Sequence, residues 1–344
     1  MSATTDTAPG GLMAAEIAEQ PAVLARLLAV PEALLEVGAR IAAARPRFVL
    51  IAARGTSDNA ALYAKYLAEV RLELPVGLAS PSALTVYGAT PDMRDVVFIA
   101  VSQSGRSPDL VDSVSIARAR GALSVAVTND LGSPLAQAAE HAVGIDAGAE
   151  RAVAATKTYT AELLALHLLL SGPEGAREAA PLPDAAAATL GRTSDQQLAA
   201  QAARLRDTQR IVVTARGYSY ATAREAALKL METSYLSAQA FSGADLLHGP
   251  LAMIDETVPV IAVSAPGRGG EAMRPVLERL TALHADTMLV GADGDLPIAA
   301  DGVPEHLLPV LEILPLQRLA WRVALDRGLD PDRPRGLSKI TQTR

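Results

Sequence analysis

The stretch RFVLIAARGTSDNAALYAKYLAE, residues 47–69, returns in diverged form as RIVVTARGYSYATAREAALKLME, residues 210–232. Each copy begins with a short β-rich run, passes an Arg-Gly pair and continues into a helical pattern. The pairs Arg54-Gly55 and Arg216-Gly217 align, and the copies lie about 160 residues apart, which indicates an internal duplication. The sequence therefore predicts two similar α/β domains.

Short apolar strand patterns alternate with longer helical patterns along the chain, which is typical of βαβ units with helices on both faces of a mostly parallel sheet. We expect two tandem αβα sandwich domains at 31–172 and 191–325, with an N-terminal helical segment (1–30), a Pro- and Ala-rich linker (173–190) and a C-terminal tail (326–344). Besides the run that opens the second copy, the expected strands lie at 47–55, 95–105, 123–130, 141–148, 258–267 and 286–294. The expected helices lie at 56–70, 106–121, 133–140, 155–172, 218–235 and 271–286.

The composition excludes several classes of protein. A net charge of −7 argues against non-specific nucleic-acid binding, which needs a basic face. The chain has no cysteine, so disulfides, thiolate metal sites and cysteine nucleophiles are excluded. Residues 1–20 lack the pattern of a signal peptide, and the longest apolar stretch, ELLALHLLLSG, is far below the ~20 residues of a membrane span. We expect a cytoplasmic protein that binds neither nucleic acid nor membrane.

Hydroxyl side chains gather where predicted strands lead into helices. VSQSGRSPDL, residues 101–110, carries three serines and a glutamine, and ARGTSDN and AATKTYT add further hydroxyls. Such turns lie at the carboxyl ends of parallel strands, where backbone N–H groups and the helix dipole favour a phosphate. Ordinary helix caps are the alternative. A P-loop pattern is lacking, so we expect a phosphorylated small molecule rather than a nucleoside triphosphate.

Three further sites, one of them a group of three residues, are candidates for acid–base or covalent chemistry. Glu225, Lys229 and Glu232 share one face of the helix at 218–235, either as a plain helical ion pair or as a group that moves protons at carbon. His248 stands in the loop sequence HGPLAMID, where a surface histidine is the ordinary interpretation. Lys339 stands near the end of the chain; most such lysines are solvated, and one that forms an imine has to be docked.

Taken together, these stretches resemble the sugar isomerase (SIS) domain family of phosphosugar isomerases. The resemblance is to the isomerase half of glucosamine-6-phosphate synthase and to stand-alone glucosamine-6-phosphate deaminases. It covers nearly the whole chain, from about residue 15 to 340, through the segments EIAEQP, ARGTSDNAALYAKY, VSQSGRSPD, AATKTYTAEL, ARGYSYATAREAALKLMETSY, HGPLAMID and DPDRPRGLSK.

The resemblance implies roles for individual residues. Glu232 would be the base that moves a proton between C1 and C2, with Lys229 as its helical neighbour. His248 would open the sugar ring, and Lys339 would form an imine with the keto sugar. The phosphate and substrate contacts would come from Thr56, Ser57, Ser102, Gln103, Ser104 and Ser107, and from backbone groups of Val153 and Ser338.

The sequence departs from the family pattern at several positions. Arg106 stands where the family usually has Glu, Ala155 replaces a usual Ser, and Gly336 and Ser338 replace the usual Asn and Ala beside the tail lysine. The synthases also carry an N-terminal glutaminase domain with a nucleophilic Cys. Because the isomerase match begins by residue 15 and the chain has no Cys, we expect no release of ammonia from glutamine by this chain.

The favoured function is aldose–ketose isomerisation that converts glucosamine 6-phosphate to fructose 6-phosphate and ammonia. We expect a homodimer, and no metal or redox cofactor, because no His/Asp/Glu spacing suggests one. The alternatives are a fructosamine-6-phosphate deglycase, ammonia-dependent glucosamine-6-phosphate synthesis and a non-catalytic sugar-phosphate sensor. A sensor of this family would usually carry an N-terminal helix-turn-helix module, for which the residues before the first strand are too few and too acidic.

Overall fold

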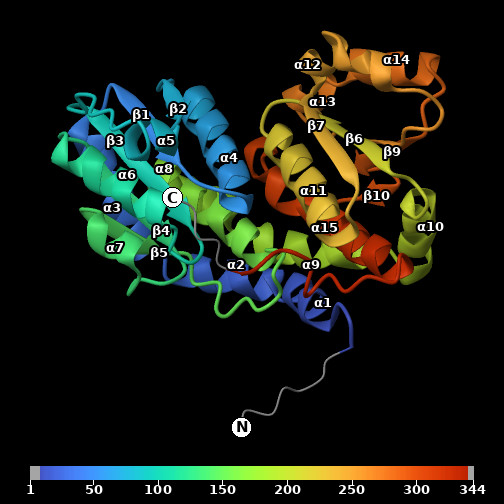
Figure 1. Cartoon of the computed structure of the whole chain (residues 1–344), viewed down its shortest axis with the longest axis horizontal. Helices are drawn as coiled ribbons and strands as arrows, with labels where there is room; N and C mark the ends of the chain where they lie inside the picture. The colour runs from blue at the N-terminus through green and yellow to red at the C-terminus, as the bar shows by residue number, and fades with distance from the viewer. Residues whose placement is uncertain (1–7, 340–344) are drawn as a thin grey trace. The chain divides into compact units, whose positions relative to one another are not determined.

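The structure is a computed structural model of the chain and describes residues 8–339. These residues form two compact units. The N-terminal unit comprises Ala22–Gly148 and Thr158–Pro183, and the C-terminal unit comprises residues 8–21, Ala149–Lys157 and Asp184–Lys339. Each unit is built on its own five-stranded sheet with helices around it (Figure 1). The predicted two-domain α/β fold is therefore confirmed.

The sheet of the N-terminal unit is entirely parallel, in the order β2-β1-β3-β4-β5. Its strands are β1 (Phe48–Ala52), β2 (Val76–Leu78), β3 (Val96–Ser102), β4 (Leu123–Thr128) and β5 (His141–Gly144). Ala52 pairs with Ala100 and Ser102 pairs with Thr128, so β1, β3 and β4 end at the same edge of the sheet. This is the edge at which parallel sheets bind ligands.

Helices cover this sheet because its strands are apolar on both sides. They are α2 (Gln20–Ala29), α3 (Glu32–Ala44), α4 (Thr56–Arg71), α5 (Pro81–Thr85), α6 (Pro108–Ala119), α7 (Pro134–Ala138) and α8 (Lys157–Ala179). Phe98, Leu110 and Leu135 join β3, α6 and α7 in one buried cluster. Gly38 of α3 lies so close to α8 that a Cβ would stand 2.4 Å from the Leu169 carbonyl oxygen, so only glycine fits there.

The C-terminal unit repeats the parallel arrangement, in the order β10-β9-β8-β6-β7. Its strands are β6 (Arg210–Ala215), β7 (Ser237–Ser242), β8 (Val260–Val263), β9 (Thr287–Gly291) and β10 (Leu296–Pro297). Its helices are α1 (Gly11–Ala18), α9 (Leu182–Arg192), α10 (Asp195–Leu205), α11 (Ser219–Ser234), α12 (Gly243–Leu247), α13 (Arg268–Glu271), α14 (Arg274–Ala282) and α15 (Leu308–Asp326), with short 3₁₀ turns η1 (Pro250–Met253) and η2 (Glu305–Leu307).

The structure contains strands and helices that were not expected from the sequence, the helices α3, α10 and α15 among them, and it replaces the expected linker with helices. β2, β7 and β10 are short strands at or near the sheet edges that the sequence pattern did not reveal. The segment 173–190, expected as a linker, is helical and belongs to α8 and α9. Gly172, with φ 63° and ψ −152°, and Pro173 mark a kink in α8, but the alanines that follow favour a helix.

Glu312 of α15 joins this helix to α11 inside the C-terminal unit. Its carboxylate accepts hydrogen bonds from the Ser219 hydroxyl at 2.7 Å and the Thr222 hydroxyl at 2.8 Å. The side chain is fully buried, and this burial raises the pKa of Glu312 to about 7, although the two hydrogen bonds oppose the shift. α11 is also the helix that carries Lys229 and Glu232.

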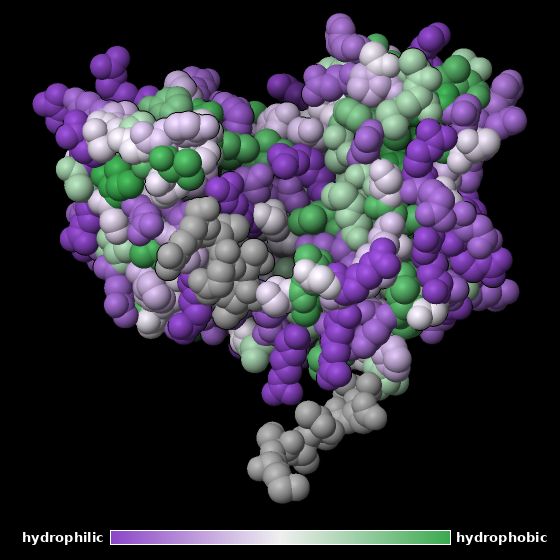
Figure 2. Space-filling view, in the orientation of Figure 1, coloured by the Kyte–Doolittle hydropathy of each residue, from purple (hydrophilic) through white to green (hydrophobic). Residues whose placement is uncertain are grey.

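No helix within residues 8–339 is long and apolar enough to cross a membrane. On the face shown in Figure 2, hydrophilic and hydrophobic residues are interspersed in small groups.

We predict that Glu312→Gln makes stability less dependent on pH. Because the pKa of Glu312 is raised above its ordinary value of 4.5, the folded protein favours the protonated carboxyl. The stabilising contribution is complete below about pH 4.5 and is lost as the pH rises through about 7. The Tm of the wild type, measured from pH 5 to 8, should therefore fall more steeply than that of the variant. The exposed Glu36→Gln is the control, and equal slopes for all three proteins would contradict the prediction.

Candidate functional site

The loop after β3 contains four of the residues predicted to bind phosphate. Ser102 ends the strand and is buried, whereas Gln103, Ser104 and Ser107 are partly exposed. Gly105 has a φ of 61°, and its N–H donates to the Ser102 hydroxyl oxygen at 3.2 Å. The loop is therefore tightly turned, with Ser107 as the first residue before α6.

Neighbouring turns fix this loop at the edge of the N-terminal sheet. The N–H of Asn129, after β4, donates to the Gln103 carbonyl oxygen at 3.1 Å. Arg54, in the turn after β1, donates to the buried Asp109 carboxylate of α6 at 2.8 Å. The turns after β1, β3 and β4 are thus directly connected, as the sequence predicts for a single ligand-binding edge. Arg106 directs its guanidinium to Asp130 at 2.8 Å, and both side chains are largely exposed.

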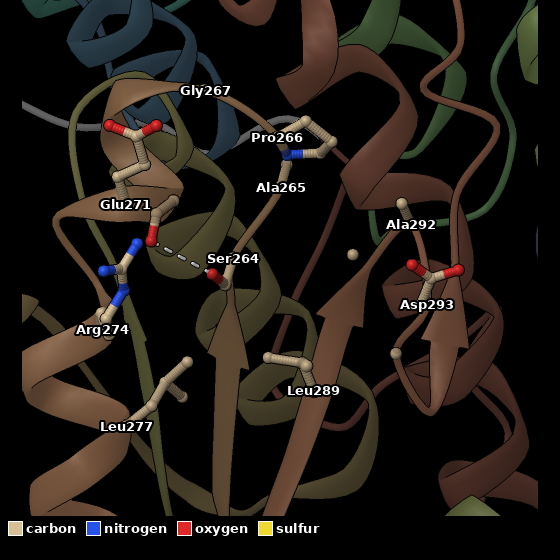
Figure 3. A pocket seen from close by; sticks show the side chains of 13 residues that line it. Ser264, Ala265, Pro266, Gly267, Glu271, Arg274, Leu277, Leu289, Ala292 and Asp293 are labelled. Atoms are coloured by element: carbon tan, nitrogen blue, oxygen red, sulfur yellow. Dashed lines mark hydrogen bonds between the residues drawn. The ribbon is translucent and has the colours of Figure 1, made fainter.

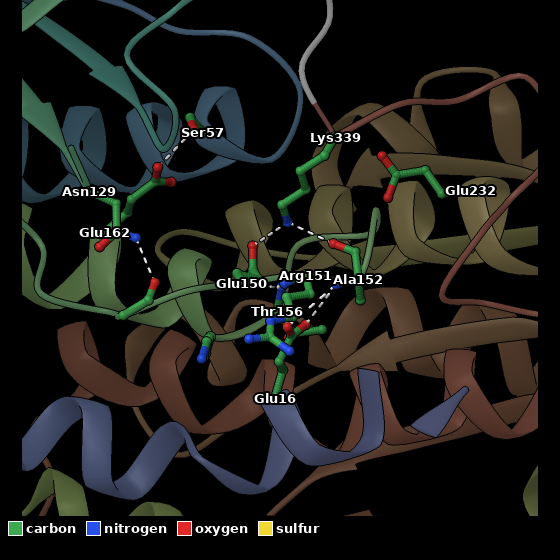
Figure 4. A network of polar contacts seen from close by, with 12 residues as sticks. Glu16, Ser57, Asn129, Glu150, Arg151, Ala152, Thr156, Glu162, Glu232 and Lys339 are labelled. Atoms are coloured by element: carbon green, nitrogen blue, oxygen red, sulfur yellow. Dashed lines mark hydrogen bonds and ion pairs between the residues drawn. The ribbon is translucent and has the colours of Figure 1, made fainter. Parts of the chain in front are cut away.

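Ser57 and Thr56 lie in the first turn of α4, at the same edge of the sheet. The buried Ser57 hydroxyl donates to the Glu162 carboxylate of α8 at 2.8 Å (Figure 4). Glu162 is itself buried and was not singled out from the sequence. A ligand oxygen that binds the Ser57 hydroxyl would have to share it with this carboxylate.

The predicted group on α11 is present in the C-terminal unit. The Lys229 Nζ lies 2.6 Å from the Glu232 carboxylate and 3.3 Å from the Glu225 carboxylate. Burial alone would lower the pKa of Lys229, but the two carboxylates outweigh it and raise the pKa above its usual value. Lys229 therefore remains an ammonium and orients Glu232, whose side chain is partly exposed and can reach a ligand.

His248 is the C-cap residue of α12 and is exposed. Its backbone N–H donates to the Asp245 carbonyl oxygen at 3.0 Å. Within residues 8–339 its imidazole makes no hydrogen bond or ion pair, so the structure does not connect it to the other predicted residues. The role of His248 stays a prediction.

Lys339 is docked by two contacts within the C-terminal unit. Its Nζ donates to the Glu150 carboxylate at 2.6 Å and to the Ala152 carbonyl oxygen at 2.7 Å (Figure 4). The Glu150 side chain is fully buried, and its other oxygen accepts the Thr156 N–H at 2.9 Å. This lysine is therefore held in one place, which the imine role requires.

The remaining predicted contacts lie next to this lysine in sequence or in space. The Val153 N–H donates to the Asp332 carbonyl oxygen at 3.1 Å, so a backbone contact of Val153 to a ligand would use its carbonyl group. Ser338 is exposed and immediately precedes Lys339. Earlier in the tail, the Arg335 N–H donates to the Tyr235 hydroxyl at 2.8 Å, and the Arg335 guanidinium lies over the Tyr235 ring.

Glu16 of α1 supports the loop that holds Lys339. Its carboxylate accepts the backbone N–H groups of Arg151 and Ala152. Burial raises the pKa of Glu16 to about 7; the two backbone hydrogen bonds and Lys339 lower it, and Glu150 raises it further. Neither Glu16 nor Glu150 was predicted from the sequence as a site residue, because their partners are separated from them in the chain or are backbone groups.

A separate cavity of about 520 Å³ lies at the ends of β8 and β9 (Figure 3). Ser264, Glu271, Arg274 and Asp293 are among the residues that line it. None of the residues predicted from the sequence to carry chemistry lines this cavity.

Known proteins similar to this chain share both its sequence pattern and its fold. The SIS domain matches residues 44–172 and 204–305. The chain is 34% identical over 339 residues to the glutamine–fructose-6-phosphate aminotransferase [isomerizing] of Methanothermobacter thermautotrophicus, which covers 95% of this chain and 56% of that protein. It is 34% identical over 309 residues to the enzyme of the same name from Pyrococcus horikoshii, which covers 85% of this chain and 51% of that protein. The chain thus spans about half the length of the curated relatives it matches.

Solved structures of other proteins have the same fold as this chain. A candidate phosphosugar isomerase from Silicibacter pomeroyi superimposes with a TM-score of 0.82 and 32% identity, over 93% of this chain and 99% of that one. The C-terminal domain of glucosamine-fructose-6-phosphate aminotransferase from Francisella tularensis gives a TM-score of 0.82 at 24% identity, over 97% of this chain and 100% of that one, and supports the fold alone. With the duplicated sheets and the matches above, the chain belongs to the SIS domain family.

Proposed function

We propose that this chain is an isomerising deaminase that converts glucosamine 6-phosphate to fructose 6-phosphate and ammonia. The observation that carries the proposal is the docked Lys339, an amine held at 2.6 Å from a buried carboxylate in the unit that also contains the Lys229–Glu232 pair. A purely phosphate-binding protein has no need for either arrangement. The names of the matched relatives support a phosphorylated sugar as the substrate.

In the proposed reaction the loop at residues 102–107 binds the phosphate. Its serine hydroxyls and the start of α6 supply neutral donors to the dianion. His248 opens the pyranose ring by acid–base catalysis, in a homodimer as the family resemblance implies. Open-chain glucosamine 6-phosphate then presents an aldehyde at C1 and an amine at C2.

Glu232 takes the proton from C2 and returns it to C1. A second proton passes from the C2 amine to the C1 oxygen, so the aldose becomes the C2 imine of fructose 6-phosphate with no net loss of protons or electrons. Lys229 holds the carboxylate through its ammonium. Attack by the Lys339 amine on C2 releases ammonia and leaves a lysine imine, which water hydrolyses to fructose 6-phosphate.

Ammonia release from a panel of phosphosugars tests the proposal. Glucosamine 6-phosphate should release ammonia and form fructose 6-phosphate. Release from fructosamine 6-phosphate alone would favour a deglycase, and net consumption of ammonia with fructose 6-phosphate would favour synthesis. Binding without turnover of any of these would favour a sensor. Size-exclusion chromatography with light scattering tests the homodimer.

We predict that Ser102→Ala and Ser104→Ala each weaken binding of fructose 6-phosphate. Loss of a donor to a charged group costs about 1.5–3 kcal/mol, or roughly ten- to a hundredfold in Kd. Isothermal titration calorimetry would measure the change. Ser115→Ala, on the exposed side of α6, is the matched control and should bind normally. Wild-type affinity in both loop variants would place the phosphate elsewhere.

We predict that Glu232→Gln abolishes proton transfer at carbon. The amide keeps the shape of the side chain but cannot accept a proton, so exchange of the C2 hydrogen with deuterated solvent should fall by at least about a hundredfold. Proton NMR of the sugar phosphate measures the exchange. Glu278→Gln, an exposed carboxylate on α14, is the control. Exchange at the wild-type rate in Glu232→Gln would remove this residue from the mechanism.

We predict that borohydride traps fructose 6-phosphate on Lys339. The chain has only four lysines, and Lys157 and Lys229 are buried, so peptide mass spectrometry can assign the adduct without ambiguity. Lys339→Arg keeps a positive charge beside Glu150 but cannot form an imine, and it should show no adduct. An adduct on another lysine, or full deamination by Lys339→Arg, would contradict the covalent role.

A further inference from the structure

The segment EIAEQP, residues 16–21, takes no part in the chemistry proposed above. In the structure it contacts the segment at residues 150–157, which contains Glu150, Ala152 and Val153. Both segments belong to the C-terminal unit. Glu16 and Glu19 contact this segment directly at different points, and Gln20 is linked to it through Gln317.

Glu16 contacts the first part of that segment. Its carboxylate accepts the Ala152 N–H at 3.3 and 3.4 Å and also accepts the Arg151 N–H. The residue is only 4% exposed. A buried carboxylate that accepts two successive N–H groups fixes the orientation of the peptide between them.

Glu19 contacts the second part directly, and Gln20 is linked to it through Gln317. Glu19 pairs with the buried Lys157 ammonium at 2.5 Å. Gln20 donates to the Gln317 side-chain oxygen at 2.8 Å, and Gln317 in turn donates to the Thr156 carbonyl oxygen at 3.2 Å. The segment at 150–157 is therefore held at both ends by residues 16–20.

The opposite side of the same segment holds the tail. Glu150 and the Ala152 carbonyl group accept the Lys339 ammonium, and the Val153 N–H bonds the Asp332 carbonyl oxygen. Asp332 also accepts the Met13 N–H of α1 at 2.8 Å. The contacts thus link α1 to the loop and the loop to Lys339 (Figure 4), and Asp332 links the tail back to α1.

We propose that Glu16 is a positioning residue for Lys339. It fixes the peptide at residues 151–152 so that the Ala152 carbonyl oxygen and the Glu150 carboxylate hold the lysine amine in one place. Glu16 makes no hydrogen bond to the lysine side chain in the described structure and positions it through this loop. The inference rests on the proposed function, because positioning matters for catalysis only if Lys339 reacts.

The test measures the accessibility of the Lys339 amine directly. In Glu16→Gln an amide nitrogen replaces one carboxylate oxygen, so the Ala152 N–H loses one of its two acceptors and faces a donor instead. The loop should loosen, and acetylation of Lys339 by acetic anhydride should speed up about tenfold as the amine leaves its partners. Lys65, in the N-terminal unit, is the internal reference in the same mass spectrum.

Two further variants make the result specific. Glu19→Gln removes the ion pair with Lys157. Because the Glu19 side chain is half-exposed, this variant should fold. It should also speed up Lys339 labelling, but less than Glu16→Gln does. Glu312→Gln alters a carboxylate that is equally buried but has no contact with residues 16–20 in the described structure, and it should leave Lys339 labelling unchanged. Thermal unfolding confirms that each variant is folded.

The kinetic consequence separates positioning from binding. Glu16→Gln should lower kcat for deamination about tenfold and leave the Kd for fructose 6-phosphate within about twofold, because only the reacting amine is displaced. Unchanged Lys339 labelling in both Glu16→Gln and Glu19→Gln would overturn the inference. If the wild type released no ammonia from glucosamine 6-phosphate, the proposed function would instead be overturned, while the labelling result would still test whether Glu16 positions Lys339.

Discussion

The ion pair between Lys339 and Glu150 is the contact on which the arrangement of the C-terminal unit around its tail depends. A lysine near the end of a chain loses considerable side-chain entropy when it is fixed in one position, so its partners have to be fixed as well. Glu150 meets this condition because it is buried and because its second oxygen is occupied by the Thr156 N–H. The Ala152 carbonyl oxygen meets it because Glu16 holds the adjoining peptide. The order of the tail is thus a property of the loop and of α1 rather than of the tail sequence alone.

The parallel register of β1, β3 and β4 determines where the predicted phosphate-binding turns lie. The strands end together, and the turns that follow them are connected by Arg54–Asp109 and Asn129–Gln103. The sequence was sufficient to predict this edge, because strand periodicity and hydroxyl-rich turns are both local features. It was also sufficient for the two-domain fold, because the duplication repeats the strand, the Arg-Gly turn and the helix together.

The parts that could not be predicted share a physical cause. β2 and β10 are three and two residues long, too short for a periodic pattern, and β7 has the mixed sequence SAQAFS. Glu16, Glu150, Glu162 and Glu312 look like surface residues in the sequence, and only distant partners reveal that they are buried. The position of Ser57 at the start of a helix was predicted from the sequence, but its hydrogen bond to Glu162 of α8 was not, because Glu162 is distant in the chain. Local patterns locate a turn, whereas the hydrogen-bond partner of a buried carboxylate depends on the tertiary fold.

The contact of α1 with the tail also constrains the order in which the chain can fold. Residues Leu12 and Met13 donate to Asp332, across a sequence separation of about 320 residues. The segments of the N-terminal unit, 22–148 and 158–183, lie between these partners in the sequence. During synthesis this unit has all its described residues once position 183 has emerged from the ribosome, whereas α1 must wait for Asp332 before the polar cap at its first turn can form. The loop at 150–157 is made midway, and its buried Glu150 acquires its lysine partner only when residue 339 appears. Until then the buried Glu150 carboxylate of the nascent chain has the Thr156 N–H but not the Lys339 ammonium, whereas Glu16 can already accept the Arg151 and Ala152 N–H groups.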